Sequence, residues 1–531
     1  MNSYFRRRLL AVLMLAAVVV SSATSAANLP LPTAEATSSI TARDLKMHLS
    51  FLASEELGGR YTLSPSNRVA ARYLASQLES FGYRGAARDG SYFQRVPLSL
   101  RDVDRAASRV TLNLAGVKRE FNFGDAFLAE TPADMNVSGG LVFAGSGISS
   151  PRNNYDDYAG INVKGKIVVI VDGTPDSLKG ASLSAEELAD ASALAHGAVG
   201  AIKIPDAQTL LTWEQLKVWL GGQQQLGLPP RKTAAGKSLP QIIAGPELIK
   251  AIARTMGKDL SDMMASANRP KPAALTASAE VKLRVAVKDA PPAQNVVAIL
   301  DGADPNLKDQ FVVLSAHYDH LKTGDKGEVY HGADDDGSGT VSVLEIAQAF
   351  SVGPRPRRSI LIVFHTGEEL GLFGSEFNTD YEPVVPLDKL VTNLNIDMVG
   401  RSRPPGDDDP RDAHLTDKDS IYIIGADKLS SELNKLNEET NLATSRMKFD
   451  YMYNDEKHPE RFYYRSDHYN YAKHGIPIIF YFTGVHRDYH KPTDVVEKID
   501  FEKMERIGRM IFATGWRVAN LDHRLVVDKR Q

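Results

Sequence analysis

The sequence predicts an α/β fold with a mixed, largely parallel central sheet flanked by helices, interrupted by an inserted β-rich domain. Continuous apolar runs of strand length follow residue 295, with helical stretches between several of them. Runs that are apolar on both faces are expected of strands that helices cover on both sides. Between residues 109 and 278 the pattern changes to shorter β-type runs broken by Gly, Asn and Asp, which indicates a different unit.

The expected elements divide the chain into three parts after an N-terminal leader. Residues 28–108 form the first part of the main domain, with two helices within 41–81 separated by a loop at 58–65. The insert, 109–278, is expected to fold as a separate lobe over the cleft. Its strands are predicted at 110–114, 140–144, 166–171 and 201–204, its helices at 188–200 and 210–220, and a loop or lid at 221–230. The rest of the main domain, 279–531, carries strands at 296–300, 312–316, 360–364, 391–396 and 476–482.

The first residues have the pattern of an export signal. Arg6, Arg7 and Arg8 precede an apolar run over 9–20, and small residues follow up to Ala27. The run is too short to span a bilayer comfortably, which takes about 20 apolar residues. We therefore expect residues 1–27 to be a cleaved signal peptide and the mature protein to be periplasmic or secreted, without a membrane span; an uncleaved N-terminal anchor is the alternative.

Composition and charge exclude several classes of protein. The 531 residues are 43% hydrophobic and 24% charged, which allows two or three domains with substantial cores. A net charge of -4 with intermixed signs gives no basic stripe for nucleic acid. Cysteine is absent from the sequence, so thiol catalysis and disulfides are excluded, and a metal would be bound through nitrogen and oxygen.

Five acidic and imidazole residues fall at the strand ends of one predicted sheet. His317 and Asp397 follow strands directly, Glu369 and His490 lie in loops after strands, and Asp335 belongs to an aspartate run before a helix. Each has an ordinary structural explanation when taken alone. Ligands of open α/β sheets gather beyond the carboxyl ends of strands. The joint pattern therefore favours one functional site.

Competing motifs are missing from the sequence. The aspartate run lacks the alternate-residue pattern of an EF-hand, and there is no H-E-x-x-H helix. A serine nucleophile is unsupported because no G-x-S-x-G elbow occurs.

Taken together, the motifs resemble peptidase family M28, zinc peptidases that include bacterial aminopeptidases and glutamate carboxypeptidases. The resemblance covers nearly the whole chain. Its carriers, in order, are SAHYDHL (315–321), GADDDGSG (332–339), TGEELGLFGS (366–375), NIDMVG (395–400), SDH (466–468) and YHKPTD (489–494). Residues 139–205 also resemble a protease-associated (PA) domain, through much weaker motifs.

The resemblance implies a centre with two zinc ions, for which cobalt or manganese could substitute. Asp335 would bridge the two ions. His317 and Asp397 would complete one metal, and Glu369 and His490 the other.

Further roles are implied for residues beside these ligands. Glu368 would be the general base, and Tyr489 a donor to the developing oxyanion. Asp319 would accept the other ring N–H of His317 and fix its tautomer. The resemblance also implies a cis peptide bond after Asp335. Three other histidines near the motifs, His320, His331 and His486, fit no ligand position of the family. His468 is a better candidate, as a residue of the substrate pocket. Trp213 and Trp219 are expected to pack a lid or the insert.

The resemblance implies an exported dinuclear zinc aminopeptidase acting on peptides. A carboxypeptidase for acidic C-terminal residues, or another amide hydrolase of the same fold, is the alternative. A non-catalytic binding protein is disfavoured because all five ligands and the base are present. Side-chain preference and oligomeric state do not follow from the sequence.

Overall fold

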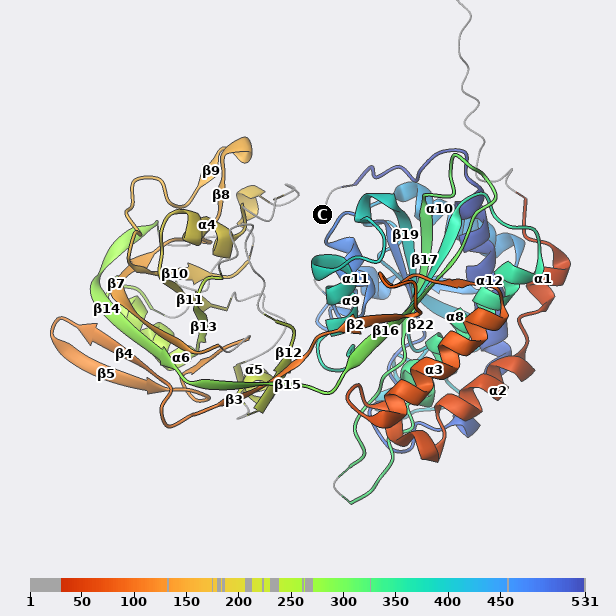
Figure 1. Cartoon of the computed structure of the whole chain (residues 1–531), viewed down its shortest axis with the longest axis horizontal. Coiled ribbons are helices and arrows are strands. Elements are labelled where there is room, and N and C mark those ends of the chain that lie inside the picture. The colour runs from red at the N-terminus through yellow and green to blue at the C-terminus, as the bar shows by residue number, and fades with distance from the viewer. Residues whose placement is uncertain are drawn as a thin grey trace, which may run out of the picture.

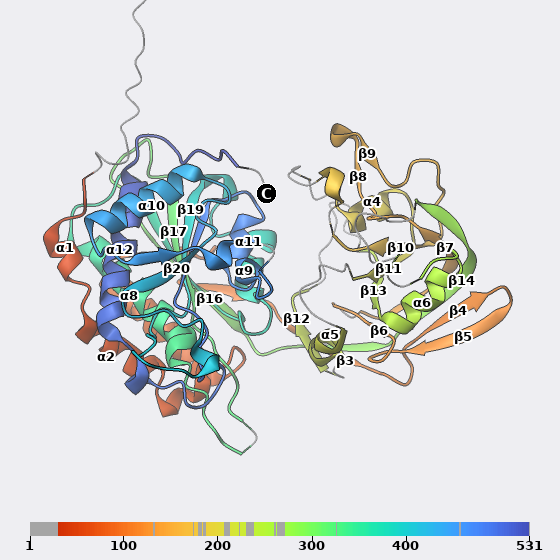
Figure 2. The same ribbon diagram turned by 180° about the vertical axis from the view of Figure 1, so that it is seen from behind.

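The computed structural model describes residues 30–529, apart from gaps at 131–132, 174, 179–182, 184–186, 206–212, 222–223, 230–237, 260–261, 263–270, 325 and 456–457. The predicted signal peptide, residues 1–27, lies outside the described residues. Within the described ranges, no helix has both the length and the apolar character needed to cross a membrane. Figures 1 and 2 show two lobes side by side, one around each of two large sheets.

The main lobe is built on a mixed sheet to which nine of the described strands belong. β17 pairs in parallel with both β18 and β19, and β19 pairs in parallel with β22. β16 and β20 add antiparallel neighbours on the two sides. The bounds are β1 Arg84–Gly85, β2 Phe93–Val96, β16 Ala293–Leu300, β17 Phe311–His317, β18 Ser359–His365, β19 Leu390–Ile396, β20 Ser420–Ile424, β21 Lys448–Asp450 and β22 Ile478–Phe482. The predicted mixed sheet is confirmed, although it is less parallel than expected: among the described strands, four of its eight pairings are parallel and four are antiparallel.

Burial explains why these strands read as continuous apolar runs. Every residue of β17, β18 and β19 is buried, because helices and loops cover both faces of the sheet. One face packs against α2 Ala42–Leu52, α3 Pro65–Ser80, α8 Gly339–Val352, α10 Ser431–Ala443 and α12 Phe501–Asn520. The other face packs against α11 His468–Ala472 and neighbouring loops. The short helices α1 Ala34–Ser38 and α9 Phe373–Glu376 complete the main lobe.

The two helices predicted within 41–81 are confirmed, and their start signals are visible in the sequence. Thr41 caps α2 by accepting from the backbone N–H of Asp44. Ser64 caps α3 in the same way through Asn67, and Pro65 occupies the first helical position, where its missing N–H costs nothing.

The second lobe contains a sheet of eight described strands with its own core. Its bounds are β4 Arg109–Leu114, β5 Val117–Asn122, β6 Phe127–Leu128, β7 Met135–Phe143, β10 Ile167–Val171, β11 Gly200–Ile204, β13 Gln241–Ala244 and β14 Ala273–Leu283. The short pair β8 Ser149–Ser150 and β9 Tyr155–Asp156 and the helices α4 Ala189–Ala195, α5 Trp213–Leu220 and α6 Pro246–Arg254 accompany it. The insert is β-rich, as the sequence predicts.

One predicted loop of the insert is wrong. The segment 221–230 contains β12, Gln224–Gly227, which pairs with β3, Ser99–Val103. β3 also pairs with β15, Val285–Asp289. This small sheet therefore contains one strand from inside the predicted insert, β12, and one strand from each side of it, β3 and β15. Residue 278 falls inside β14. We propose 99–289 as the insert; its limits and its likeness to a PA domain remain predictions.

The insert touches the main lobe through a small apolar cluster beside the segment that carries Glu368 and Glu369. Leu228, which follows β12, is buried in this cluster together with Phe377 of the main lobe. The hydroxyl of Tyr381 donates to the carbonyl of Pro229 at 3.0 Å. The insert therefore contacts the main lobe at residues that lie nine and thirteen positions after the predicted base, Glu368.

A buried histidine–glutamate pair ties α2 to α8. His48 Nε2 lies 3.2 Å from Glu345 Oε1, and His48 Nδ1 lies 2.6 Å from the hydroxyl of Tyr73. We expect Glu345→Ala to lower the free energy of unfolding by about 3–5 kcal/mol, because it removes one partner of a buried pair. Urea unfolding measures this change. Gln348→Ala, at a partly exposed position of α8, is the control and should change stability by only about 0.5 kcal/mol; equal effects of the two substitutions would contradict the expectation.

Candidate metal centre and active site

The five predicted ligands come together beyond the carboxyl ends of the central strands. His317 is the last residue of β17, and Asp397 follows β19 directly. Glu369 and His490 lie in the loops after β18 and β22, and Asp335 lies in the turn before α8. Neighbouring parallel strands end at the same edge of the sheet, which is why residues so distant in sequence meet here. The Asp335–Asp336 peptide bond is cis, which confirms that prediction.

The distances place Asp335 between two groups. Asp335 Oδ1 lies 3.3 Å from His317 Nε2, and Asp335 Oδ2 lies 3.0 Å from His490 Nε2. On the first side, Asp397 Oδ1 is 3.7 Å from His317 Nε2. On the second side, Glu369 Oε2 is 3.1 Å from His490 Nε2. Each oxygen of Asp335 thus faces one imidazole, and one further carboxylate completes each side.

These donor atoms fit two divalent cations. Asp335 Oδ2 and His490 Nε2 are buried and have no hydrogen-bond partner among the described residues, although they lie close to one another. Burial alone would raise the pKa of Asp335, but the neighbouring imidazoles of His317 and His490 outweigh it and hold that pKa well below its ordinary value. A buried set of imidazole nitrogens and ionised carboxylates is the donor set that zinc prefers when cysteine is absent.

Donor spacing alone would choose partly different ligands. By that criterion two groups could hold an ion: His317, Asp336 and Asp397; and His320, Asp335 and Glu369. The carboxylate of Asp336 is already engaged, since it accepts backbone N–H groups from His317, Gly339 and Met398 at 2.9–3.2 Å. We therefore assign Asp336 to holding the ligand-bearing turns in place.

Glu368 and Glu369 point to opposite sides of the site. Glu368 Oε2 lies 3.8 Å from His317 Nε2, whereas Glu369 contacts His490. Burial raises the pKa of Glu368 well above its ordinary value. A carboxyl with a raised pKa beside the proposed centre suits the exchange of a proton near neutral pH.

Asp319 lies at the site, but its carboxylate does not make the predicted contact. The acceptor nearest His317 Nδ1 is the backbone carbonyl of Asp319 at 3.1 Å, while the carboxylate is 3.8 Å away. The carboxylate instead accepts from Thr62 Oγ1 at 2.8 Å and from the backbone N–H of Glu368 at 3.3 Å. Its physical effect is thus to hold the turn that carries Glu368.

Tyr489 stacks on His490, with ring centroids 3.9 Å apart and planes inclined by 23°. Burial, with the nearby charges of Asp335 and Glu369, raises the pKa of Tyr489 well above its ordinary value. The phenol therefore keeps its proton at neutral pH and can donate a hydrogen bond.

Several supporting residues have no role in the sequence-based prediction. Asp494 accepts the backbone N–H groups of Asp334 and Asp335, so it joins the aspartate turn to the loop that carries His490. Ser466 donates to Asp397 Oδ2 at 2.6 Å. Both lie inside the quoted motifs YHKPTD and SDH, which were the signals available for finding them.

The remaining histidines differ from one another. His468 is a core residue: its Nε2 lies 2.7 Å from the carbonyl of Tyr463, and its ring stacks on Phe480. His486 pairs with Asp334 behind the site, and His331 contacts the carbonyl of Ala53. His320, in contrast, contacts a predicted ligand directly.

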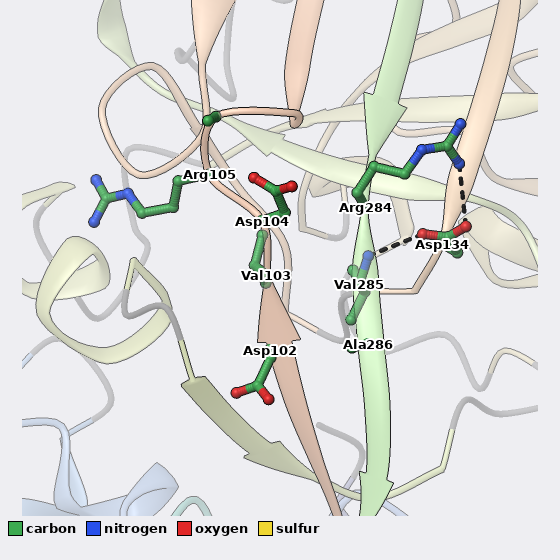
Figure 3. A pocket seen from close by; sticks show the side chains of 9 residues that line it. Asp102, Val103, Asp104, Arg105, Asp134, Arg284, Val285 and Ala286 are labelled. Atoms are coloured by element: carbon green, nitrogen blue, oxygen red, sulfur yellow. Dashed lines mark hydrogen bonds and ion pairs between the residues drawn. The ribbon is translucent and has the colours of Figure 1, made fainter.

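A cavity in the second lobe lies away from this chemistry. It is lined by residues of β3, β15 and adjoining turns, where Asp134 pairs with Arg284 at 3.1 Å and accepts from the backbone N–H of Val285 (Figure 3). None of the predicted site residues lines it.

Comparisons with known proteins find relatives for parts of the chain. Residues 295–515 match the model of peptidase family M28. Aminopeptidase YwaD of Bacillus subtilis is 26% identical over 265 residues, 49% of this chain and 52% of the relative. Leupeptin-inactivating enzyme 1 of Streptomyces exfoliatus is 34% identical over 120 residues, 22% of this chain and 25% of that protein. The matches therefore span about half and a quarter of these relatives.

Solved structures of similar proteins cover more of the chain. The aminopeptidase from Aneurinibacillus sp. strain AM-1 superposes with a TM-score of 0.46 and 20% identity, over 94% of this chain and 98% of that one. BSAP, a zinc aminopeptidase from Bacillus subtilis, has a TM-score of 0.42 and 20% identity, over 90% and 94% of the two chains.

Proposed function

We propose that the protein is a dinuclear zinc aminopeptidase that removes N-terminal residues from peptides. The proposal starts from the membership of residues 295–515 in peptidase family M28. The observation that carries the proposal is the position of Asp335, whose two carboxylate oxygens lie 3.3 and 3.0 Å from two different imidazoles. The aminopeptidase activity in the name of the relative YwaD favours the N-terminal direction. The apolar and basic leader, residues 1–27, supports export.

The five ligands would divide between two ions. His317 and Asp397 would hold one, Glu369 and His490 the other, and Asp335 would bridge them. When bound, two such ions lower the pKa of a water and polarise the scissile carbonyl.

Glu368 would move the proton that this reaction requires. Its carboxylate accepts a proton from the attacking water and returns it to the amine that leaves, so one residue serves first as base and then as acid. Its raised pKa supports the second step, because a protonated carboxyl must persist long enough to donate. Asp319 keeps Glu368 in place by accepting its backbone N–H.

Tyr489 would stabilise the charge that develops on the carbonyl oxygen. Its phenol keeps its proton, and stacking on His490 fixes the ring beside the proposed centre. A hydrogen-bond donor aimed at the developing oxyanion lowers the energy of the transition state more than that of the substrate.

Peptides blocked at one end test the direction of cleavage. We expect a peptide that is amidated at its C-terminus, with a free N-terminal amine, to be cleaved. For the same peptide acetylated at its N-terminus, with a free C-terminal carboxylate, we expect kcat/KM to be lower by on the order of 10²-fold or more, because a site built for a free amine rejects an amide there. Mass spectrometry identifies the products, and their amounts over time give both rates. Glu368→Gln protein purified in the same way controls for contaminating peptidases. Cleavage of the acetylated peptide alone would make the enzyme a carboxypeptidase.

A further inference from the structure

We propose that His320 is a positioning residue of the metal centre. Its ring N–H would hold one oxygen of Glu369, so that the other oxygen alone faces the ion shared with His490. This inference rests on the proposed function, because it assigns the orientation of one proposed ligand.

The two oxygens of Glu369 contact different imidazoles. Glu369 Oε1 lies 2.6 Å from His320 Nδ1, and Glu369 Oε2 lies 3.1 Å from His490 Nε2. His320 Nδ1 is 3.8 Å from the nearest oxygen of Asp335, beyond hydrogen-bond distance. The contact of His320 is therefore with Glu369, and it leaves the bridging carboxylate to the other two imidazoles.

The surroundings of His320 indicate which ring nitrogen donates. The side chain is completely buried, and its Nε2 has no hydrogen-bond partner within the described part of the chain. An ionised carboxylate only accepts, so the hydrogen between His320 and Glu369 belongs to Nδ1. A ring with its proton on Nδ1 also avoids a buried, unpaired N–H on Nε2, which would cost free energy. His320 is thus a donor to Glu369 and acts on the ion through it.

Backbone packing fixes the ring of His320 where this contact requires it. Gly332, which opens the aspartate turn, has a φ of +56°, and a Cβ there would lie 2.5 Å from His320 Cγ and 2.3 Å from the carbonyl oxygen of Asp335. The ring of His320 also meets that of His490 edge-on, with centroids 5.8 Å apart. Only a glycine at 332 leaves room for this imidazole, which fills the space between three ligand-bearing segments.

Metal affinity tests the role of His320 separately from turnover. We expect His320→Ala to weaken binding of one zinc ion by about 10–100-fold, the usual effect of removing a partner that orients a metal ligand, with a smaller effect on the other ion. His320→Asn should restore most of that affinity, because its amide N–H can replace the Nδ1 donor. Affinities are measured by competition with a chromogenic chelator, beside thermal unfolding of the metal-free proteins.

His48→Ala is the matched control. His48 is also a buried histidine that contacts a glutamate, at 3.2 Å, but it lies between α2 and α8 and contacts no proposed ligand. It should lower thermal stability and leave both zinc affinities unchanged. If His320→Ala does not fold, His320→Gln replaces it, because its amide lies one bond farther from the backbone and should not reproduce the contact.

The outcomes separate this inference from the proposed function. If the wild-type protein binds two zinc ions and His320→Ala or His320→Gln binds both with unchanged affinity, the positioning role is wrong. Failure of Asn to recover affinity that Ala has lost would equally overturn it, because the loss would then reflect packing. If the wild-type protein itself does not bind two ions, the proposed dinuclear centre is wrong instead.

Discussion

Replacement of Glu368 by glutamine is expected to lower kcat by on the order of 10² to 10⁴ while both metal ions remain bound. Glutamine keeps the size and shape of the side chain but cannot accept a proton. Glu368 Oε2 lies 3.8 Å from His317 Nε2, and Glu368 is not one of the proposed ligands, so its substitution leaves the donor set intact. Steady-state kinetics and the zinc content of the purified variant measure the two effects.

Glu369→Gln is the matched control at the adjacent position. Its carboxylate contacts His490 and His320 at 3.1 and 2.6 Å, so a neutral amide there should weaken one metal site directly. The two variants should differ in zinc content although the substituted residues are adjacent in the sequence. Loss of zinc from Glu368→Gln and its retention by Glu369→Gln would reverse the two roles, and full activity of both would place catalysis elsewhere.

The main lobe could be predicted from the sequence because its central strands are buried on both faces. Such strands appear as unbroken apolar runs, and the residue after each run marks the edge of the sheet where ligands gather. His317 and Asp397 are found by this rule, since one ends β17 and the other follows β19. The two helices within 41–81 were predicted from their apolar spacing, although the predicted loop at 58–65 ends one residue late, because Pro65 is the first residue of α3.

Features that depend on distant partners could not be predicted in this way. β12 is a strand because it pairs with β3, more than a hundred residues earlier, and its polar sequence gives no local sign of pairing. Its strand conformation therefore depends on the tertiary structure of the lobe and not on its own sequence. The same reason applies to the limits of the insert, which lie in paired strands at both ends.

The aspartate run shows the same limit at the scale of single side chains. Asp334 accepts the backbone N–H of Gly400, Asp335 faces two imidazoles, and Asp336 accepts three backbone N–H groups. Three adjacent identical residues thus have three different surroundings. Composition and spacing do not distinguish them, and the resemblance to a family selected Asp335.

Removal of the metal ions by a chelator is expected to abolish peptidase activity and to lower the thermal stability of a protein that stays folded. An ion that binds only the folded state stabilises it by about 2.7 kcal/mol at a free concentration 100 times its Kd, and two ions contribute separately. Part of the charge compensation survives metal removal. Burial favours a neutral His490, but Asp335 and Glu369 outweigh it and raise the pKa of His490 to about 10, so this ring is protonated at neutral pH beside both carboxylates.

Thermal unfolding of the chelated protein at increasing zinc concentration measures this stabilisation. Tm should rise with zinc and activity should return over the same range, because one binding event controls both. Asp335→Asn is the control: it removes the carboxylate that contacts both imidazoles, so its Tm should respond little to zinc. A wild-type Tm that does not depend on zinc, with activity that survives chelation, would contradict the metal-dependent reaction, because the buried acids would then need no cation to balance their charge.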